Sequence, residues 1–138
     1  MSLQDRLASL ISVIGADVKD IGSRTITKDF SFAGALSLYT GQATWINSTG
    51  RTLTLVNAIA SVGTAPTGSS VIVDVNKNGT TIFTTQANRP TIAIAGKSSG
   101  KKTPDVTTLA DGDSLTIDID QIGSTIAGSD LTVSITVR

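Results

Sequence analysis

Residues 71–85, with the sequence VIVDVNKNGTTIFTT, decide how the rest of the chain is interpreted. Valines at positions 71, 73 and 75 alternate with other residues, and the pair Asn78-Gly79 interrupts the pattern. An Asn-Gly pair tolerates the positive φ angles of a tight turn between two antiparallel strands. The segment therefore predicts a β-hairpin. Because a lone hairpin is only marginally stable in water, other strands must cover its valine face.

The same alternation recurs on both sides of this hairpin. It predicts strands at residues 30–32, 36–39, 45–46, 53–62, 91–95, 115–119 and 131–137, with 106–109 as a further short strand or turn. In residues 53–62 the apolar face switches near Asn57, which indicates a bulge. Seven or eight strands separated by turn signals are typical of an antiparallel β-sandwich of the jelly-roll type. We therefore expect residues 29–138 to form a mainly β domain.

Composition limits the partners and the chemistry. Eleven basic residues balance eleven acidic ones, all of them Asp, so no net field attracts nucleic acid or an anionic membrane. The chain has no Cys and no His, which removes disulfides, thiolate metal sites and the common nucleophile–base pairs. The opening segment lacks the pattern of a secretory signal, and we expect a protein that is made soluble. We expect no cofactor and no enzymatic activity.

An apolar repeat at the start of the sequence predicts a helix over residues 1–22. A connector of residues 23–28 joins this helix to the predicted β domain. The apolar stripe of the helix consists of Leu3, Leu7, Leu10, Ile14, Val18 and Ile21, in the four-three spacing of heptad a and d positions except that Asp17 takes one of them and Val18 lies beside it. Ser2 and Asp5 resemble a capping box with Asp in place of Glu, and Gly22 stands where a C-terminal cap would. Both ends of the helix are therefore marked in the sequence.

The stripe has two interpretations. In one, the helix lies on its own β domain; in the other, it zips to copies of itself. We prefer self-association, because Ile11 and Val18 widen the seam and a wide seam suits a bundle of three or more strands. We expect a trimeric coiled coil, while dimer and pentamer stay open.

Residues 74–79 resemble the first half of a calcium-binding loop. Asp74, Asn76 and Asn78 place oxygens at alternate positions, and a Gly follows where such loops bend. The twelfth position is Thr85 where a bidentate Glu belongs, and the flanking residues alternate as strands do. We therefore interpret these three residues as weak candidate ligands and expect no metal.

Other polar and aromatic residues give weak candidates for contact with a glycan. Tyr39 and Trp45 are candidates for a sugar-stacking platform, and Lys97, Lys101 and Lys102 for contact with an anionic sugar. The simpler interpretations are core aromatics and a solvated loop. The acidic residues Asp111, Asp113, Asp118 and Asp120 contain the carboxylates that glycan hydrolysis needs, but no pattern indicates a cleft around them.

Three segments resemble a known group of proteins. SLQDRLASLISVIGADVKDI resembles the N-terminal helices of tail-fibre and minor structural proteins in phages of actinobacteria. ASVGTAPTGSSVIVDVNKNGTTIFTTQANRPTI and LADGDSLTIDIDQIGSTIAGSDLTVSITVR look like the β-rich terminal domain of such virion proteins. The resemblance implies a homotrimeric spike on the surface of a phage particle, with a coiled-coil stem, a β-sandwich knob and no catalytic residues.

The resemblance also implies the partners. They are further copies of this chain, other virion proteins and, for a tail fibre that binds a receptor, a glycan on the host surface. The helix leads almost directly into the knob, whereas long fibres carry an extended shaft. A capsid-decoration or head-fibre protein is therefore the alternative, and a polysaccharide depolymerase is the third.

Overall fold

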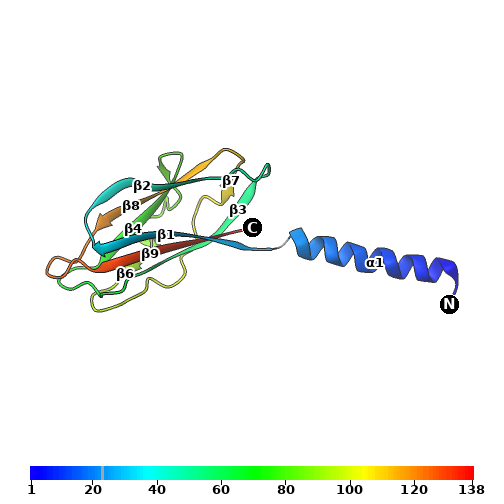
Figure 1. The fold of residues 1–138 in the computed structure, drawn as a ribbon, viewed down its shortest axis with the longest axis horizontal. Coiled ribbons are helices and arrows are strands. Elements are labelled where there is room, and N and C mark those ends of the chain that lie inside the picture. The colour runs from blue at the N-terminus through cyan, green and yellow to red at the C-terminus, as the bar shows by residue number, and fades with distance from the viewer. Residues whose placement is uncertain (23) are drawn as a thin grey trace.

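The chain forms one N-terminal helix followed by two antiparallel β-sheets (Figure 1). A computed structural model describes residues 1–22 and 24–138, without the side chains of residues 20–22. The side chain of the predicted seam residue Ile21, the capping role of Gly22 and the first connector residue, Ser23, lie outside what is described. The prediction of a mainly β protein with an N-terminal helix is confirmed, and the two sheets are consistent with a β-sandwich.

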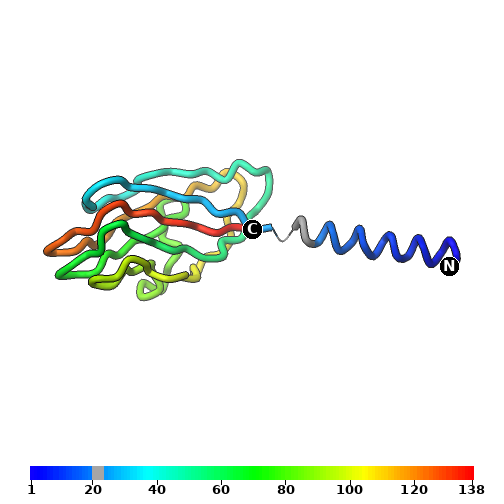
Figure 2. Tube along the Cα trace, turned by 60° about the horizontal axis from the view of Figure 1, so that its bottom comes forward, coloured from blue at the N-terminus to red at the C-terminus, as the bar shows by residue number. Residues whose placement is uncertain are grey.

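The elements follow the chain in a simple order. They are α1 (Leu3–Gly22), β1 (Ile26–Ala35), β2 (Tyr39–Ile46), β3 (Leu53–Ser61), β4 (Val71–Lys77), β5 (Thr80–Thr81), the 3-10 helix η1 (Gln86–Asn88), β6 (Thr91–Ile92), β7 (Thr108–Leu109), β8 (Ser114–Gln121) and β9 (Ser129–Val137). Figure 2 shows α1 leading away from the β domain along the long axis of the molecule.

The two sheets enclose the core. One has the strand order β1-β9-β3-β7, and the other has the order β2-β8-β4-β5, with β6 also paired to β4. Alternate residues of the long strands point between the sheets, as the period of two requires. The fully buried side chains include Val71, Val73 and Val75 of β4, Leu115 and Ile117 of β8, and Leu131, Val133 and Val137 of β9. The valine face of the hairpin is thus covered, as its sequence predicts.

The predicted hairpin turn is confirmed, but its second strand is shorter than predicted. Asn78 and Gly79 have φ angles of 50° and 82°, and Lys77 pairs with Thr80 across the turn. β5 ends at Thr81, and the next two residues, Ile82 and Phe83, are both fully buried. Consecutive residues of a regular strand face opposite sides, so burying both side chains requires the chain to leave the ladder.

The predicted strand at residues 91–95 is also shorter, because β6 ends at Ile92. Ala95 has a φ of 61°, and its N–H donates to the carbonyl of Pro66, 2.9 Å away. A positive φ at a residue other than Gly marks a turn, which an alternation of apolar residues does not reveal.

The connector is shorter than the predicted range of residues 23–28. β1 begins at Ile26, which pairs with Val137, and Lys28 pairs with Ile135. The long strand β9 offers partners for these residues, and a polar side chain such as Lys28 does not prevent pairing. Residues 26–28 therefore belong to the β domain, which corrects the predicted boundary.

The bulge predicted near Asn57 is confirmed in β3. Leu55 pairs with Val137 and Asn57 pairs with Thr136, so Val56 is the extra residue. Leu53 and Leu55 are buried before the bulge, whereas Ala58 and Ala60 are buried after it. The extra residue changes which alternate positions face the core.

Gly123 lies where the loop after β8 turns back on itself, and its N–H donates to the carbonyl of Ala127, 3.0 Å away. A Cβ atom at this position would lie 1.8 Å from the carbonyl oxygen of Ile126 and 3.0 Å from Cβ of Pro66. Because the closest atom belongs to the backbone, the loop would have to move. We expect Gly123→Ala to lower the free energy of unfolding by about 2–3 kcal/mol in urea titrations.

Gly15→Ala is the control for that variant. An added Cβ at Gly15 meets no atom within 4 Å, and the residue lies in α1, outside the β domain. The unfolding of the β domain should therefore be unchanged in this variant. Equal stability of Gly123→Ala and the wild type would contradict the close approach at Gly123.

Candidate functional site

The helix begins with the predicted capping box. Ser2 Oγ donates to Asp5 Oδ2 at 2.6 Å, the Ser2 N–H donates to the same oxygen at 3.1 Å, and the Asp5 N–H donates to Ser2 Oγ at 3.1 Å. The hydroxyl of Ser2, and then its N–H, hold the pKa of Asp5 below its usual value. These reciprocal bonds satisfy donors that a helix N-terminus otherwise leaves free, and they fix where α1 starts.

The apolar stripe of α1 is uncovered in the single chain. The exposed fractions are 54% for Leu7, 55% for Leu10 and 51% for Ile14, and Leu3 and Val18 are exposed further still. The β domain does not bury this stripe, which is evidence against the interpretation that the helix lies on its own domain. Val13, which the sequence analysis had not included, is also exposed and adds to one flank.

A shallow hollow lies at the N-terminal end of the stripe, lined by Leu3, Arg6, Leu7 and Leu10. Burying a Leu or Ile side chain fully stabilises by about 1.5–3 kcal/mol relative to leaving it in water. A helix with several such side chains along one side gains most by packing against another apolar surface. The stripe is therefore the strongest candidate for an interaction surface in the described part of the chain.

Tyr39 and Trp45, the predicted stacking aromatics, both lie on β2. The Tyr39 ring stacks on Phe32 of β1, with the ring centroids 6.1 Å apart and an angle of 23° between the planes. Lys28 of β1 places its Nζ 5.0 Å from the centroid of the Trp45 ring. One face of each ring is therefore taken by a residue of β1, and these contacts join the edges of the two sheets.

The predicted lysines lie along the other side of the β domain. Their segment follows β3: the Val62 N–H donates to the carbonyl of Lys97, and Lys102 pairs with Ala58. Lys97 and Lys101 are exposed and Lys102 is half-buried. The segment is thus tied to β3 by its backbone, unlike the free solvated loop expected from the sequence. Since β1 and β3 lie on opposite sides of β9, the fold does not bring these lysines to the aromatics.

Two of the three candidate calcium ligands, Asp74 and Asn78, already hold hydrogen bonds within the chain. Asp74 Oδ1 accepts from Thr81 Oγ1 at 2.7 Å and from the Val75 N–H at 2.8 Å. Asn78 donates from Nδ2 to Asp113 and accepts from the Ser114 N–H at Oδ1. Within residues 1–22 and 24–138, no three acidic, His or Cys side chains are grouped so that they would hold a metal ion.

Calcium should therefore leave the stability of the protein unchanged. We expect the same melting temperature in millimolar calcium and in excess chelator. A ligand that binds only the folded state raises the melting temperature, so a rise with calcium would show that Asp74, Asn76 and Asn78 converge on the ion after all.

Asp74 is a buried carboxyl on β4. Its residue is 7% exposed, and desolvation by burial raises its pKa, against the hydrogen bonds from Thr81 and Val75 that lower it. A raised pKa in the folded state means that this group favours folding below its pKa in the unfolded chain. That contribution is lost as the pH rises through the folded-state pKa.

Asp74→Asn should reveal this effect. The amide keeps an oxygen acceptor for Thr81 and Val75 without a buried charge, so we expect the variant to be at least as stable as the wild type at pH 7. As the pH falls toward 4, the wild type should gain stability relative to the variant. Urea unfolding at both pH values measures the difference, in which the titration of the other carboxylates cancels. If Asp74→Asn were much less stable than the wild type at pH 7, the conclusion that burial of the Asp74 charge opposes folding would be wrong.

The acidic residues near the end of the chain also hold structural contacts. Asp111 accepts from the Gly50 N–H, Asp118 accepts from the Gly41 N–H, and Asp120 forms an ion pair with Arg89. Asp113 accepts from Asn78 and from the Ala110 N–H, and these bonds, the Asn78 one foremost, lower its pKa. Each of these four carboxylates therefore has a partner within the chain that it holds in a loop or against a neighbouring strand.

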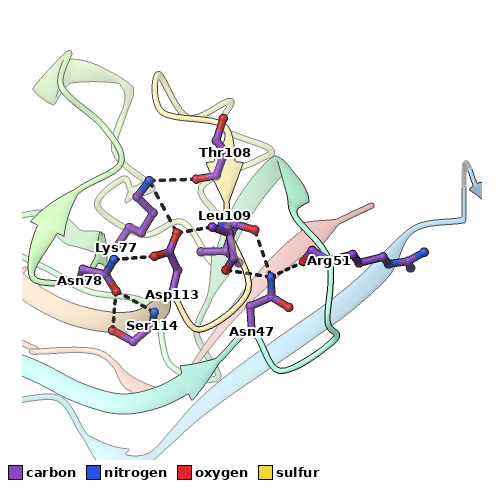
Figure 3. A network of polar contacts seen from close by, with 9 residues as sticks. Asn47, Arg51, Lys77, Asn78, Thr108, Leu109, Asp113 and Ser114 are labelled. Carbon is purple, nitrogen blue, oxygen red and sulfur yellow. Dashed lines mark hydrogen bonds and ion pairs between the residues drawn. The ribbon is translucent and has the colours of Figure 1, made fainter.

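Asn47 is a structural residue that the sequence analysis did not single out. Its side chain is fully buried, and Nδ2 donates to the carbonyls of Arg51, Leu109 and Ala110 at 2.9, 3.0 and 3.0 Å. Figure 3 shows this cluster beside Asp113, Asn78 and Lys77. Asn47 thus ties the turn after β2 to the segment before β8. The run Asn47-Ser48-Thr49-Gly50 indicates a turn, but no local pattern reveals the carbonyls of Leu109 and Ala110, which lie far along the chain.

Comparison with models of known protein families and with curated proteins finds no match to this sequence. Among the described residues, no helix combines the length and the apolar character needed to cross a membrane.

Proposed function

We propose that this protein is a homotrimeric spike whose helices form the stem and whose β domains form the knob. The observation that carries the proposal is the exposed stripe of α1, at a distance from a β domain that has a complete core of its own. A wide seam with apolar flanks favours three strands over two. Association would cover Leu7, Leu10 and Ile14 at once, which a single chain leaves in water.

The proposed knob is a jelly roll. In a jelly roll the chain folds back on itself as one long antiparallel ribbon, which is wound around a single core. The first strand therefore pairs with the last, the second with the second-last, and so on inward. The pairings β1 with β9, β2 with β8, β3 with β7 and β4 with β5 follow that order. They support two Greek keys wound around one core.

The proposed place of the spike is the surface of a phage particle, as the resemblance of the helix and of the β segments implies. Its role there is attachment to the host surface, without enzymatic activity. The end of the β domain farthest from α1 carries the turn between β1 and β2 (Figure 1). The Leu36 N–H donates to the carbonyl of Gly128 and ties this turn to the loop before β9. The Ile126 N–H donates to Thr67 Oγ1 and ties that loop to the one before β4.

Apolar side chains project at this far end. Leu38, Ile94 and Ile126 are 63%, 55% and 48% exposed and lie in or beside the tied loops. In a spike held by its stem, this end points outward and is the surface that supports attachment. A capsid-decoration or head-fibre protein is the alternative, and it would use the same trimer on the head of the particle.

Immunogold electron microscopy of intact particles tests the location. Antibody raised against the full chain should label the tail end of the particle if the spike attaches to the host. Label over the head would favour the decoration role, and absence of label from purified particles would overturn the proposal. Incubation with host envelope glycans tests the absence of activity, since release of reducing ends would show a depolymerase.

A further inference from the structure

One side of the β domain is formed by two long edge strands. β1 is the outermost strand of one sheet and β2 that of the other, and the Phe32–Tyr39 and Lys28–Trp45 contacts bridge them. We call this side the β1–β2 edge. On the other side the chain covers its own long strands, with β7 beside β3, and with β5 and β6 beside β4. Short outer strands of this kind protect a sheet from pairing with other chains.

β2 lacks such protection. Seven of its eight residues are exposed, and only Trp45 is half-buried. The exposure includes both faces: Tyr39 pairs with Ile119, whose side chain faces the core, whereas Ile46 pairs with Ser114 on the outer face. The exposed fractions are 39% for Tyr39 and 53% for Ile46.

The sequence of β2 also lacks charge. Residues 39–46 read YTGQATWI and contain no Lys, Arg, Asp or Pro, which are residues that discourage pairing at an exposed edge. Two irregularities in the register between β2 and β8 are the feature of this strand that disfavours edge pairing. The charged residues of the neighbouring β1 are engaged, since Lys28 lies over Trp45 and Asp29 accepts from Ser134 Oγ. β2 is thus an uncharged and exposed edge strand, which is suited to contact with another uncharged surface.

The connector determines what can reach this edge. α1 ends at Gly22 and β1 begins at Ile26, and four peptide units span at most about 14 Å. When three α1 helices zip together, the first residues of three β1 strands must therefore lie near the bundle axis. Ile26, 38% exposed at the start of β1, lies at this junction. The edge that contains β1 is thus brought close to its own copies.

We propose that the three β domains contact one another through their β1–β2 edges, so that each edge is covered by further copies of this chain. This inference rests on the proposed trimer. A closed threefold arrangement repeats the same contact three times and leaves no edge uncovered. The contact between the β domains continues the helical seam into the knob. It leaves free the loops at the end farthest from α1 and the side of the domain that contains Lys97, Lys101 and Lys102.

Single-cysteine variants of the full chain test the contact, because the natural chain has no Cys. Thr44→Cys places a thiol on β2, and Thr107→Cys places one next to β7 on the opposite side; both threonines are exposed. A short bismaleimide should join Thr44→Cys chains into linked pairs at least tenfold faster than Thr107→Cys chains. Light scattering on both variants reports the number of chains beforehand.

Trp45 provides a second measurement, since it is the only tryptophan. Its fluorescence should be quenched by acrylamide at least twofold more strongly in Leu10→Asp, which separates the helices, than in the wild type. Leu10 belongs to α1 and Trp45 to β2, and Figure 1 shows α1 leading away from the β domain. A change in quenching therefore reports the loss of contact between the β domains.

The outcomes separate the two proposals. A wild-type chain that is monomeric in light scattering overturns both the spike and the contact. An oligomer in which both cysteines react at equal rates, or in which Trp45 quenching does not change on dissociation, overturns the edge contact alone. Fast linking at Thr44→Cys together with a change in Trp45 quenching supports it.

Discussion

Leu10→Asp should convert the oligomer into single chains. The substitution places a charge in the middle of the α1 stripe and removes a side chain whose burial stabilises by about 1.5–3 kcal/mol per chain. A trimer loses this contribution three times, so we expect the association constant to fall by roughly three orders of magnitude or more. Light scattering should give a mass near that of one chain, 14.1 kDa.

Ser9→Asp is the matched control for this variant. It adds the same charge at the neighbouring residue, which lies outside the four-three stripe. Its mass should equal that of the wild type. The β domain of Leu10→Asp should unfold as before in urea, because the substituted side chain is exposed in the single chain. An unchanged mass for Leu10→Asp would show that the stripe does not hold the copies together.

Asn47→Asp should cause the largest loss of stability within the β domain. The change is nearly isosteric, but it replaces three donated hydrogen bonds with a carboxylate oxygen that faces the carbonyls of Arg51, Leu109 and Ala110. Leaving buried partners unpaired and placing a charge among them should lower the free energy of unfolding by about 3–5 kcal/mol. Urea unfolding at pH 7 measures the loss.

The pH dependence of this variant has a definite sign. A carboxyl buried at this position prefers its protonated form, which restores one donor. The deficit of Asn47→Asp relative to the wild type should therefore shrink as the pH falls toward 4. Asn88→Asp makes the same chemical change at an exposed residue and should alter stability by less than about 0.5 kcal/mol. Equal losses in the two variants would contradict the role given to Asn47.

Local patterns predicted the elements that depend on neighbouring residues. The Asn78-Gly79 turn, the Ser2–Asp5 capping box and the bulge before Asn57 follow from the conformations that a few adjacent residues prefer. The alternation in β4, β8 and β9 likewise marks the side chains that face the core. These signals survive in the fold because no distant contact opposes them.

The lengths of the short strands could not be predicted in this way. β5 ends after two residues because Ile82 and Phe83 both turn into the core. β6 ends after two residues because the chain turns near Ala95, whose N–H donates to the carbonyl of Pro66. β1 starts at Ile26 because β9 provides a partner there. Each of these boundaries depends on a residue distant in the sequence.

The candidate site divides in the same manner. The sequence by itself determined the α1 stripe and the mainly β character, because a helical or strand period is a property of consecutive residues. Only the tertiary structure decided that the aromatics and the lysines lie on opposite sides, that Asn47 reaches three carbonyls, and that β1 and β2 form one edge, of which the uncharged strand β2 is exposed. Those facts depend on which strands pair, and strand pairing is set by the packing of the whole core rather than by any single segment.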